Sequence, residues 1–365
     1  MTKKRTYIAL SGLIFLALPL FLSHYTPEHA TFEKKAVAKP RRTSVQINPY
    51  LQEVIDEYEG IIEQLQASSH TPGAAVVIVH DSTIIFMSGF GVRSTDAPDS
   101  VDENTVFRLA SVSKSFAATL TGTLVQDGLL HWNDKVVQYL PEFSLHSKDQ
   151  TEALTLAHVL SHTTGLPYHT YTNLVEENLP LDTLLSYLEE VPLIAKPGEL
   201  YCYQNVAYSI IGKVDEAAAL MSYEELMRER VFQPLGMEHA SISYEEIMHA
   251  DNVALPHYFR RGRWHPTKVN TTYYNVAPAG GVNASISDMG KWIIALLGHE
   301  PAVLSDSVRR AMFTPQVVAT SKNRNYGRWH RLRQAYYGLG WRVLHYPSDT
   351  LVYHGGYANG YRSEV

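Results

Sequence analysis

The stretch FRLASVSKSF, residues 107–116, places a serine and a lysine three positions apart, at Ser111 and Lys114. An apolar face continues from it to Leu124, which predicts a helix that ends at Gly128. Residues three apart on a helix lie on one face, one turn from each other. A serine hydroxyl needs an adjacent base to act as a nucleophile at neutral pH, and a partly desolvated lysine can be that base. We hypothesise that Ser111 attacks an acyl carbon with the help of Lys114.

Taken alone, this spacing has a second interpretation. Ser-x-x-Lys arises often by chance, and an N-cap serine followed by a solvated lysine would have the same sequence. The choice between the two interpretations depends on the other motifs in the chain.

The composition of the 365 residues predicts an ordered globular protein. Hydrophobic residues make up 45% and charged residues 19%, which is enough for a large core. The net charge of −6 gives no support for a nucleic-acid surface. Residues 1–45 carry eight lysines and arginines against two glutamates, a net charge of +6, so the remainder carries −12. The single cysteine, Cys202, excludes an intrachain disulfide and a cysteine-rich metal site.

The N-terminal segment has the pattern of an export signal. A basic cluster at residues 3–5 precedes an apolar run over 7–22, and this order is typical of secretory signals. We expect residues 1–23 to be a signal peptide or a membrane anchor, with the uncleaved anchor slightly favoured because no small-x-small cleavage site follows closely. Residues 24–47 are polar, basic and contain prolines, which indicates a linker. The prediction is an exported globular domain over 48–365, in the periplasm or cell envelope.

Hydrophobic periodicity predicts an α+β fold of the α/β sandwich type. Residues 49–67 show helical spacing, and 74–79 and 83–87 are β-rich runs joined by a short turn. A mostly helical insert is expected over about 115–310, followed by further strands. The expected helices inside the insert are 154–161, 181–190, 206–220, 223–232 and 287–297, the last opened by Ser285 and Asp288 at capping-box spacing, and the expected strands are 336–344 and 351–354. We expect the first and last strands to share one antiparallel sheet, flanked by helices.

A second polar motif follows a Pro-Gly turn. Tyr203 and Asn205 stand two residues apart on an expected loop before a helix. A phenol near a lysine can shuttle protons, and an asparagine can hold an acyl amide. The chain contains 23 tyrosines, so an ordinary turn with packed tyrosines is the alternative.

The third motif is His354-Gly355-Gly356 on the last expected strand. Glycines at a strand edge let a substrate backbone lie close to that edge. A plain exit from strand to turn is the alternative interpretation.

The three motifs occur in an order that resembles the serine penicillin-recognising superfamily, specifically the class C β-lactamase branch with its DD-peptidase and esterase relatives. Three further stretches fit the same branch, namely residues 160–167 (LSHTTGLP), 234–237 (PLGM) and 279–282 (AGGV). The resemblance covers about residues 72–365. It implies a β-lactamase/transpeptidase-like fold, with an antiparallel sheet flanked by helices, and chemistry without a metal or organic cofactor.

The resemblance also implies roles for the residues of the first two motifs. Ser111 would be the acylated nucleophile, and Lys114 would be its general-base partner. Tyr203 would work with Lys114 by passing a proton to the leaving group and later activating the hydrolytic water. Asn205 would orient Lys114 and contact the acyl side chain.

The last strand would contribute substrate-binding groups. His354, Gly355 and Gly356 would line the strand edge where substrate lies. The backbone N–H groups of Ser111 and Tyr357 would form the oxyanion hole, where the loss of one donor typically costs ~3 kcal/mol.

The chain departs from the class C pattern at two places. Class C β-lactamases usually carry Lys-Thr-Gly where this chain has the motif that begins at His354. A lysine is a fixed cation near pH 7 whereas an ordinary histidine is mostly neutral, so anchoring of a β-lactam carboxylate is weakened and a peptidase or esterase is favoured. Arg362 could supply a charge instead, although an outer strand residue is the simpler interpretation. The family also continues beyond the position of Val365 with further strands and a helix, so we expect a C-terminally truncated fragment.

The leading prediction is a serine hydrolase that forms an acyl-enzyme with an amide, ester or β-lactam, as a D-Ala-D-Ala carboxypeptidase, an esterase or a β-lactamase does. The alternative is a non-hydrolysing penicillin- or peptidoglycan-binding or sensing module of the same fold, and a structural scaffold is favoured less. His158 and His162 stand four residues apart, but no HExxH motif accompanies them and no metal is expected. The expected partners are a small-molecule or peptide substrate and, through the N-terminal segment, a membrane. No nucleic acid is expected, and the protein is expected to be a monomer.

Overall fold

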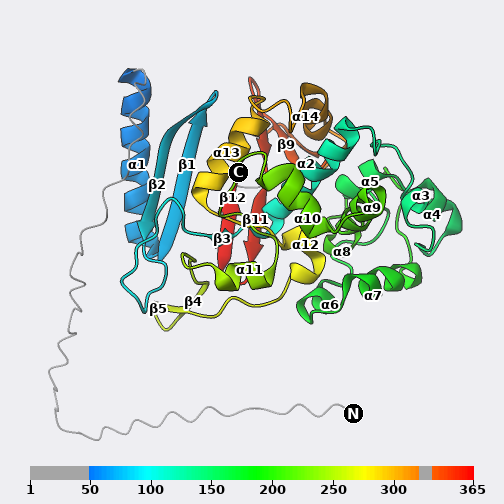
Figure 1. The fold of residues 1–365 in the computed structure, drawn as a ribbon, viewed down its shortest axis with the longest axis horizontal. Coiled ribbons are helices and arrows are strands. Elements are labelled where there is room, and N and C mark those ends of the chain that lie inside the picture. Colours follow the sequence, from blue (N-terminus) through cyan, green and yellow to red (C-terminus); the bar gives the residue numbers. More distant parts are fainter. Residues whose placement is uncertain (1–48, 320–330) are drawn as a thin grey trace, which may run out of the picture. The chain divides into compact units, whose positions relative to one another are not determined.

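A computed structural model describes residues 49–319 and 331–365 of the chain. Helices and antiparallel strands are mixed along these residues, so the predicted α+β fold is confirmed (Figure 1). The predicted signal or anchor at 1–23 and the linker at 24–47 lie outside the described residues. Over the described ranges, no helix has both the length and the apolar character that a membrane span requires.

The first elements are a helix and a β-hairpin, as the sequence predicts. Helix α1 (Pro49–Ser69) packs on strand β2 (Thr83–Gly91), which pairs antiparallel with β1 (Gly73–His80). Ile55 and Phe86 are buried between the helix and the hairpin. This contact removes the apolar stripe of α1 from water, which stabilises an amphipathic helix more than its intrinsic propensity does.

A second helix covers the other face of this hairpin. Figure 1 shows α13 (Ile286–Leu296) beside β1, and α1 on the far side of β2. A Cβ atom on Gly290 would stand 2.8 Å from Cδ1 of Ile84, so glycine permits the close approach of helix and strand. The predicted capping box at the start of α13 is confirmed, because Ser285 Oγ accepts from the Asp288 N–H (3.2 Å) and Asp288 Oδ2 accepts from the Ser285 N–H (3.1 Å).

The helical insert begins with α2 (Ser113–Gln126), in which every residue from 113 to 124 is buried. It packs against α9 (Ile210–Ala219), α12 (Ala277–Gly280) and α14 (Asp306–Phe313). The remaining helices and hairpin of the insert are α3 Val136–Tyr139, α4 Lys148–Ala153, α5 Leu156–Leu160, α6 Thr172–Glu176, α7 Leu181–Ser186, α8 Asn205–Tyr208, α10 Tyr223–Met227, α11 Tyr244–His249, and the pair β4 His257–Arg260 and β5 Arg263–Pro266. Each helix predicted in the insert therefore overlaps at least one observed helix.

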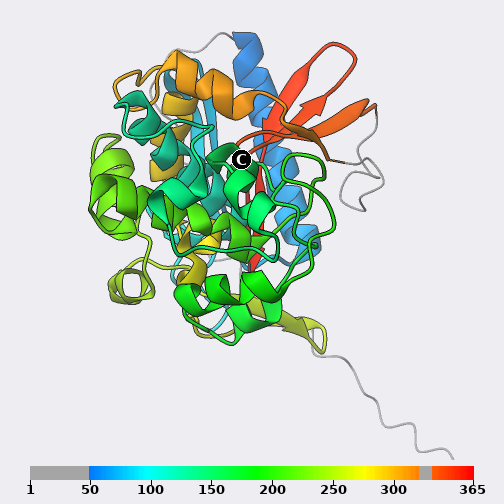
Figure 2. The same cartoon turned by 90° about the vertical axis from the view of Figure 1, so that its right-hand side faces the viewer.

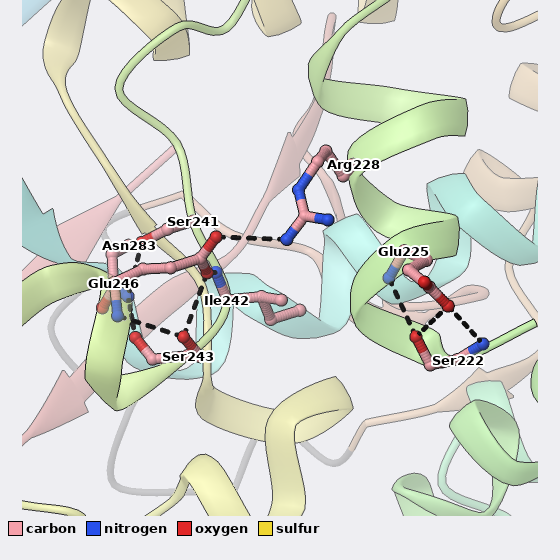
Figure 3. A network of polar contacts seen from close by, with 8 residues as sticks. All are labelled: Ser222, Glu225, Arg228, Ser241, Ile242, Ser243, Glu246 and Asn283. Atoms are coloured by element: carbon pink, nitrogen blue, oxygen red, sulfur yellow. Dashed lines mark hydrogen bonds and ion pairs between the residues drawn. The ribbon is translucent and has the colours of Figure 1, made fainter.

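Polar networks close the ends of two of these helices (Figure 3). Ser222 caps α10 by accepting a hydrogen bond from the Glu225 N–H (3.3 Å), and Glu225 accepts one from the Ser222 hydroxyl (2.6 Å). Ser243 caps α11 in the same way, through the Glu246 N–H (3.1 Å). The Glu246 carboxylate also pairs with Arg228, with 3.2 Å between Oε1 and Nη2. Caps of this kind are typically worth ~1 kcal/mol each, and the ion pair joins α11 to the turn that follows α10.

The strands after residue 316 form two groups, drawn in orange and red in Figure 2. One group is an antiparallel sheet with the order β10-β9-β8-β7, and the other is a hairpin of β11 and β12. Their bounds are β7 Val317–Val318, β8 Gln334–Tyr337, β9 Arg342–His345, β10 Thr350–Tyr353, β11 Gly355–Ala358 and β12 Tyr361–Glu364.

Two strand predictions are wrong in detail. The run expected as one strand over 336–344 is the hairpin of β8 and β9, because Gly340 turns the chain with a φ of +77°. A Cβ atom there would stand 2.8 Å from the carbonyl oxygen of Lys114, so this turn also requires glycine to pack on α2. The first and last strands do not share one sheet within the described ranges, because β1 pairs with β2 and β12 pairs with β11.

An aspartate side chain is buried in the core between α2 and α9. The carboxyl group of Asp215 is fully buried, accepts a hydrogen bond from the Thr121 hydroxyl (3.1 Å to Oδ2), and has no described partner at Oδ1. Burial raises the pKa of Asp215 well above its ordinary value, so the folded protein binds a proton that the unfolded chain releases near pH 4. This linkage lowers stability as the pH rises above the unfolded pKa.

Asp215→Asn should therefore stabilise the protein at pH 7 to 8 and have little effect near pH 4, since asparagine is isosteric and does not titrate. Chemical denaturation between pH 5 and 8 would show a widening gap between the variant and the wild type. Asp182→Asn is the control, because Asp182 is mostly exposed and paired with Lys213 (3.0 Å). A gap that stays constant with pH, or a variant that is less stable throughout, would contradict the interpretation.

Candidate active site

The turn that carries Ser111 is fixed by a short pair of strands and by α2. Strand β3 (Phe107–Arg108) pairs with β6 (Asn283–Ala284), and a 3-10 turn over Ala110–Val112 then leads into α2. Ala110 takes a φ of +48°, which is uncommon for a residue other than glycine and is often found at functional sites. Ser111 is partly exposed on this turn, directly before the buried helix.

Lys114 is fully buried, and its amine lies among three oxygen atoms. Nζ is 2.8 Å from Oδ1 of Asn205, 2.9 Å from the carbonyl oxygen of Ala279 and 3.4 Å from Oγ of Ser111. A neutral amine has two hydrogens and one lone pair. If the hydrogens go to Oδ1 of Asn205 and to the carbonyl oxygen of Ala279, two atoms that only accept, the lone pair points to the Ser111 hydroxyl. Asn205, to which the resemblance assigns the orientation of Lys114, is one of these two acceptors.

The surroundings of Lys114 favour the neutral amine. Burial, and then the charge of Arg342, hold the pKa of Lys114 well below its usual value. Nζ also lies 4.6 Å from the centre of the Tyr203 ring and 5.6 Å from that of Tyr208, contacts that favour the cation. Ring contacts of this kind are worth a few kcal/mol at most, less than the cost of burying an ammonium group, so the lowered pKa is the dominant effect.

The phenol of Tyr203 completes the group around Ser111. Burial raises the pKa of Tyr203 even though a hydrogen bond with the Ser111 side chain lowers it, so the hydroxyl keeps its proton at neutral pH. Its ring packs against the imidazole of His162, with 4.3 Å between the ring centres. His162 is held in turn by the Gln204 N–H, which donates to Nδ1 (3.2 Å).

Ser113 and Ser115 lie in the same stretch but have structural partners. The Ser113 hydroxyl oxygen accepts from the Val282 N–H (2.9 Å), and the Ser115 hydroxyl donates to the Gly340 carbonyl (2.8 Å). Both side chains are fully buried. Of the three serines, Ser111 is the one whose hydroxyl lies beside the lysine amine.

The strand edge predicted from the His-Gly-Gly motif lies against the Ser111 turn. A Cβ atom on Gly356 would stand 2.2 Å from the Leu109 carbonyl oxygen and 2.9 Å from the Ser111 nitrogen, so the close contact requires glycine. The Ser363 hydroxyl of β12 also donates to the Leu109 carbonyl (2.5 Å). Tyr357 follows directly on β11 and is 76% exposed. Strand β11, which contains Tyr357, therefore packs against the turn that contains Ser111.

The structure places His354 differently from its neighbours. Its imidazole is fully buried, accepts a hydrogen bond from the Tyr337 hydroxyl at Nε2 (2.9 Å) and donates from Nδ1 to the Gly355 carbonyl (3.0 Å). Burial, and then the charge of Arg342, hold the pKa of His354 well below its usual value. The ring is therefore neutral and turned into the protein, and only the backbone of this residue belongs to the strand edge.

The other charged and metal-ligating candidates do not join the site. Arg362 pairs with Glu364 on its own strand, with 2.6 Å between Nη2 and Oε1. His158 accepts at Nδ1 from the Thr155 N–H (3.2 Å), whereas the His162 ring lies among tyrosines. Residues 49–319 and 331–365 contain no cluster of ligands that could hold a metal ion.

Two contributors to this site carry no signal of their own in the sequence. The Ala279 carbonyl receives Lys114 from 165 positions along the chain, and Arg342 lies with its guanidinium carbon 5.8 Å from the centre of the Tyr203 ring. The stretch around Ala279 was recognised only by its resemblance. Arg342 stands in an ordinary alternating strand, and no local pattern marks it.

Comparisons of the sequence and of the structure both match this chain to β-lactamase-like proteins or a penicillin-binding protein homologue. A sequence model of the Beta-lactamase family matches residues 59–365. Beta-lactamase-like protein 4 of Dictyostelium discoideum is 26% identical over 308 residues, which is 77% of this chain and 53% of that protein. Unguisins hydrolase ungD' of Aspergillus campestris is 24% identical over 320 residues, 85% of this chain and 58% of that protein. Protein flp of Staphylococcus aureus is 27% identical over 187 residues, 51% of this chain and 38% of that protein.

The chain thus spans about half the length of the curated relatives it matches. The octameric penicillin-binding protein homologue from Pyrococcus abyssi has the same fold, with a TM-score of 0.73 at 23% identity, over 85% of this chain and 70% of that one. These matches confirm the predicted β-lactamase/transpeptidase-like fold. The expected monomeric state of this chain stays a prediction.

Proposed function

Because the chain belongs to the Beta-lactamase family, whose members are generally serine hydrolases, we propose that it hydrolyses an amide, ester or β-lactam through an acyl-enzyme on Ser111. The observation that carries this proposal is the placement of the Lys114 amine. It is buried, it has two fixed hydrogen-bond acceptors, and its third neighbour is the Ser111 hydroxyl at 3.4 Å. A serine that only capped a helix would not need a desolvated amine beside it.

Acylation starts when Ser111 Oγ forms a bond to the carbonyl carbon of the substrate and its proton moves to Lys114 Nζ. The negative charge that develops on the carbonyl oxygen is stabilised by the N–H groups of Ser111 and Tyr357. The tetrahedral intermediate then collapses and the bond to the leaving group breaks. Tyr203 gives its phenolic proton to the leaving group and regains one from the Lys114 ammonium, so both return to their starting state.

Deacylation repeats these steps with water as the nucleophile. A water molecule attacks the ester carbonyl and gives up a proton to the pair formed by Lys114 and Tyr203. That proton is returned to Ser111 Oγ as the acyl bond breaks, which releases the acid product. The same pair thus serves as base in the first half of each step and as acid in the second.

The substrate class follows partly from the last strand. The neutral, buried imidazole of His354 supplies no charge where the class C pattern has a lysine, which supports a peptidase or an esterase over a dedicated β-lactamase. One relative is named as a hydrolase of unguisins, which supports hydrolysis over binding alone.

Intact-mass measurement after mixing with an acylating substrate tests the proposal directly. The protein is incubated with a penicillin and, separately, with a p-nitrophenyl ester, and its mass is followed from seconds to hours. We expect an adduct of one acyl group, located by peptide mapping on the peptide that contains Ser111. Absence of an adduct from folded protein with both reagents would refute the acyl-enzyme mechanism.

The lifetime of the adduct separates the candidate functions. A transient adduct with release of many product molecules per enzyme indicates a hydrolase for that substrate. An adduct that persists for hours with both reagents would indicate a penicillin-binding or sensing module instead.

A further inference from the structure

The tyrosine proposed to protonate the leaving group is carried by a segment without regular structure. Residues 201–204 lie in neither a helix nor a strand, so their backbone N–H groups need partners from elsewhere in the protein. The two residues that flank Tyr203 both find that partner in His162. The His162 carbonyl oxygen accepts from the Cys202 N–H (2.8 Å), and its imidazole Nδ1 accepts from the Gln204 N–H (3.2 Å). One histidine therefore fixes the chain directly before and directly after the tyrosine.

The imidazole of His162 also contacts the Tyr203 ring itself. The two ring centres are 4.3 Å apart, with an angle of 37° between the ring planes. The imidazole lies 4.9 Å from the ring centres of Tyr208 and Tyr337 as well. Tyr208 donates a hydrogen bond to the Lys114 carbonyl (2.7 Å), which joins this group of rings to α2. Because His162 is buried among closely packed rings, a change in its side chain should displace Tyr203.

Two features of His162 are unfavourable for stability. It follows helix α5 with a φ of +58°, in the left-handed region where glycine is the usual residue at a helix end. Because Nδ1 accepts a hydrogen bond, the neutral ring carries its proton on Nε2, and that atom is buried without a hydrogen-bond partner. Strained backbone and unpaired buried groups are often found at functional sites. A role in filling the core explains neither feature.

The ring of His162 stays neutral, as the accepted hydrogen bond requires. Burial, and then the charge of Lys114, hold the pKa of His162 well below its usual value, and smaller contributions in the same direction come from His354, Arg342 and His169. An imidazolium would have no lone pair at Nδ1 for the backbone N–H that it now accepts.

We propose that His162 is a positioning residue that holds the Tyr203 phenol at the Ser111 hydroxyl, where it can protonate the leaving group. The inference rests on the proposed function. In that step the bond from the carbonyl carbon to the leaving-group oxygen breaks, and the phenolic proton moves to that oxygen. A displacement of about 1 Å can cost about a hundredfold in rate. The loss should be largest for a leaving group that cannot depart without a proton.

Two esters of phenylacetic acid test the proposal with the full chain. The 4-nitrophenyl ester has a leaving group that departs as an anion, whereas the benzyl ester has one that must be protonated as it departs. For both esters kcat/KM reports acylation, the step in which the leaving group is released. The ratio of the two kcat/KM values cancels any loss that is common to both esters, such as a smaller fraction of folded protein.

The variants separate the hydrogen bond from the packing. His162→Leu and His162→Asn have nearly the same shape, but only asparagine has an oxygen that can replace Nδ1 as the acceptor, and asparagine also tolerates a positive φ. His162→Gly takes the place of the leucine variant if that variant does not fold, because glycine suits the backbone at this position. The matched control is His158→Leu. His158 lies one helical turn earlier, and its Nδ1 also accepts a backbone N–H at 3.2 Å, that of Thr155.

We expect His162→Leu to lower kcat/KM for the benzyl ester by about 10- to 100-fold and for the 4-nitrophenyl ester by less than about threefold. His162→Asn should bring the benzyl ester back to within about fivefold of the wild type. Tyr203→Phe should already be slow on the benzyl ester, and adding His162→Leu to it should not change the ratio further. His158→Leu should keep the wild-type ratio.

Three results would overturn the proposal while the acyl-enzyme function stands. The first is equal slowing of both esters by His162→Leu, or by His162→Gly in its place. The second is an asparagine variant with the same ratio as the leucine variant. The third is a ratio that changes as much in His158→Leu, or that changes further when His162→Leu is added to Tyr203→Phe. If neither ester acylates Ser111 in the wild type, the proposed function fails and the inference fails with it.

Discussion

Ser111→Ala should remove acylation completely, with no adduct by intact mass and no turnover of any ester, amide or β-lactam above the rate without protein. The alanine variant has no hydroxyl oxygen to form the acyl bond, and no other serine hydroxyl lies beside the Lys114 amine in the described ranges. We expect a loss of at least about ten-thousandfold, because a nucleophile and its base act as one unit. The fold should be kept, since Ser111 is partly exposed and lies outside the core.

Ser113→Ala and Ser115→Ala are the matched controls, since they change the same short stretch. Both should still be labelled at Ser111. Their cost should appear in stability instead, because Ser113→Ala leaves the buried Val282 N–H unpaired and Ser115→Ala does the same to the Gly340 carbonyl. An unpaired buried group typically costs ~1–3 kcal/mol. Labelling that survives in Ser111→Ala, or disappears only in a control, would identify the wrong nucleophile.

Local sequence patterns predicted most of the helices and the residues around Ser111. A period of 3.6 residues, a capping box and a glycine stop are properties of adjacent residues, so α1, α2 and α13 could be placed from the chain alone. Ser111 and Lys114 are also neighbours along the chain. Tyr203 and Asn205 belong to a second motif. Only the resemblance to a family indicates that the two motifs form one site.

Contacts between distant parts of the chain could not be predicted in this way. Whether residues 336–344 form one strand or two depends on Gly340, whose positive φ is required by the fit against α2. The Ala279 carbonyl and the guanidinium of Arg342 reach the site only after the insert has folded. The residue type of His354 predicted a side chain that is mostly neutral near pH 7. Its burial against Tyr337, however, depends on how two strands pack together.

Lys114→Met should lower the rate of Ser111 acylation by about a thousandfold or more while keeping the hydroxyl in place. Methionine fills a similar volume without a lone pair, so the serine loses its base, and general-base catalysis typically contributes about a hundred- to ten-thousandfold. Lys114→Arg is the informative companion. It keeps donors for Asn205 and Ala279 but cannot become neutral, so it should be as slow as the methionine variant. An arginine variant that acylates near the wild-type rate would show that position 114 only positions its neighbours.

The pH dependence separates a base from a structural cation at this position. The wild-type acylation rate, measured in a single turnover by stopped flow, should rise with pH as Lys114 loses its proton and should level off below the usual pKa of a lysine, because burial lowers the pKa of Lys114. The rising limb should be absent from Lys114→Met. The unfolded chain also binds a proton that the folded amine has released, so the wild type should gain stability as the pH rises from the folded pKa toward the unfolded one, and the methionine variant should not. A limb that persists in Lys114→Met would assign the titration to another group, and a wild-type rate that falls over this range would mean that the ammonium form is the active one.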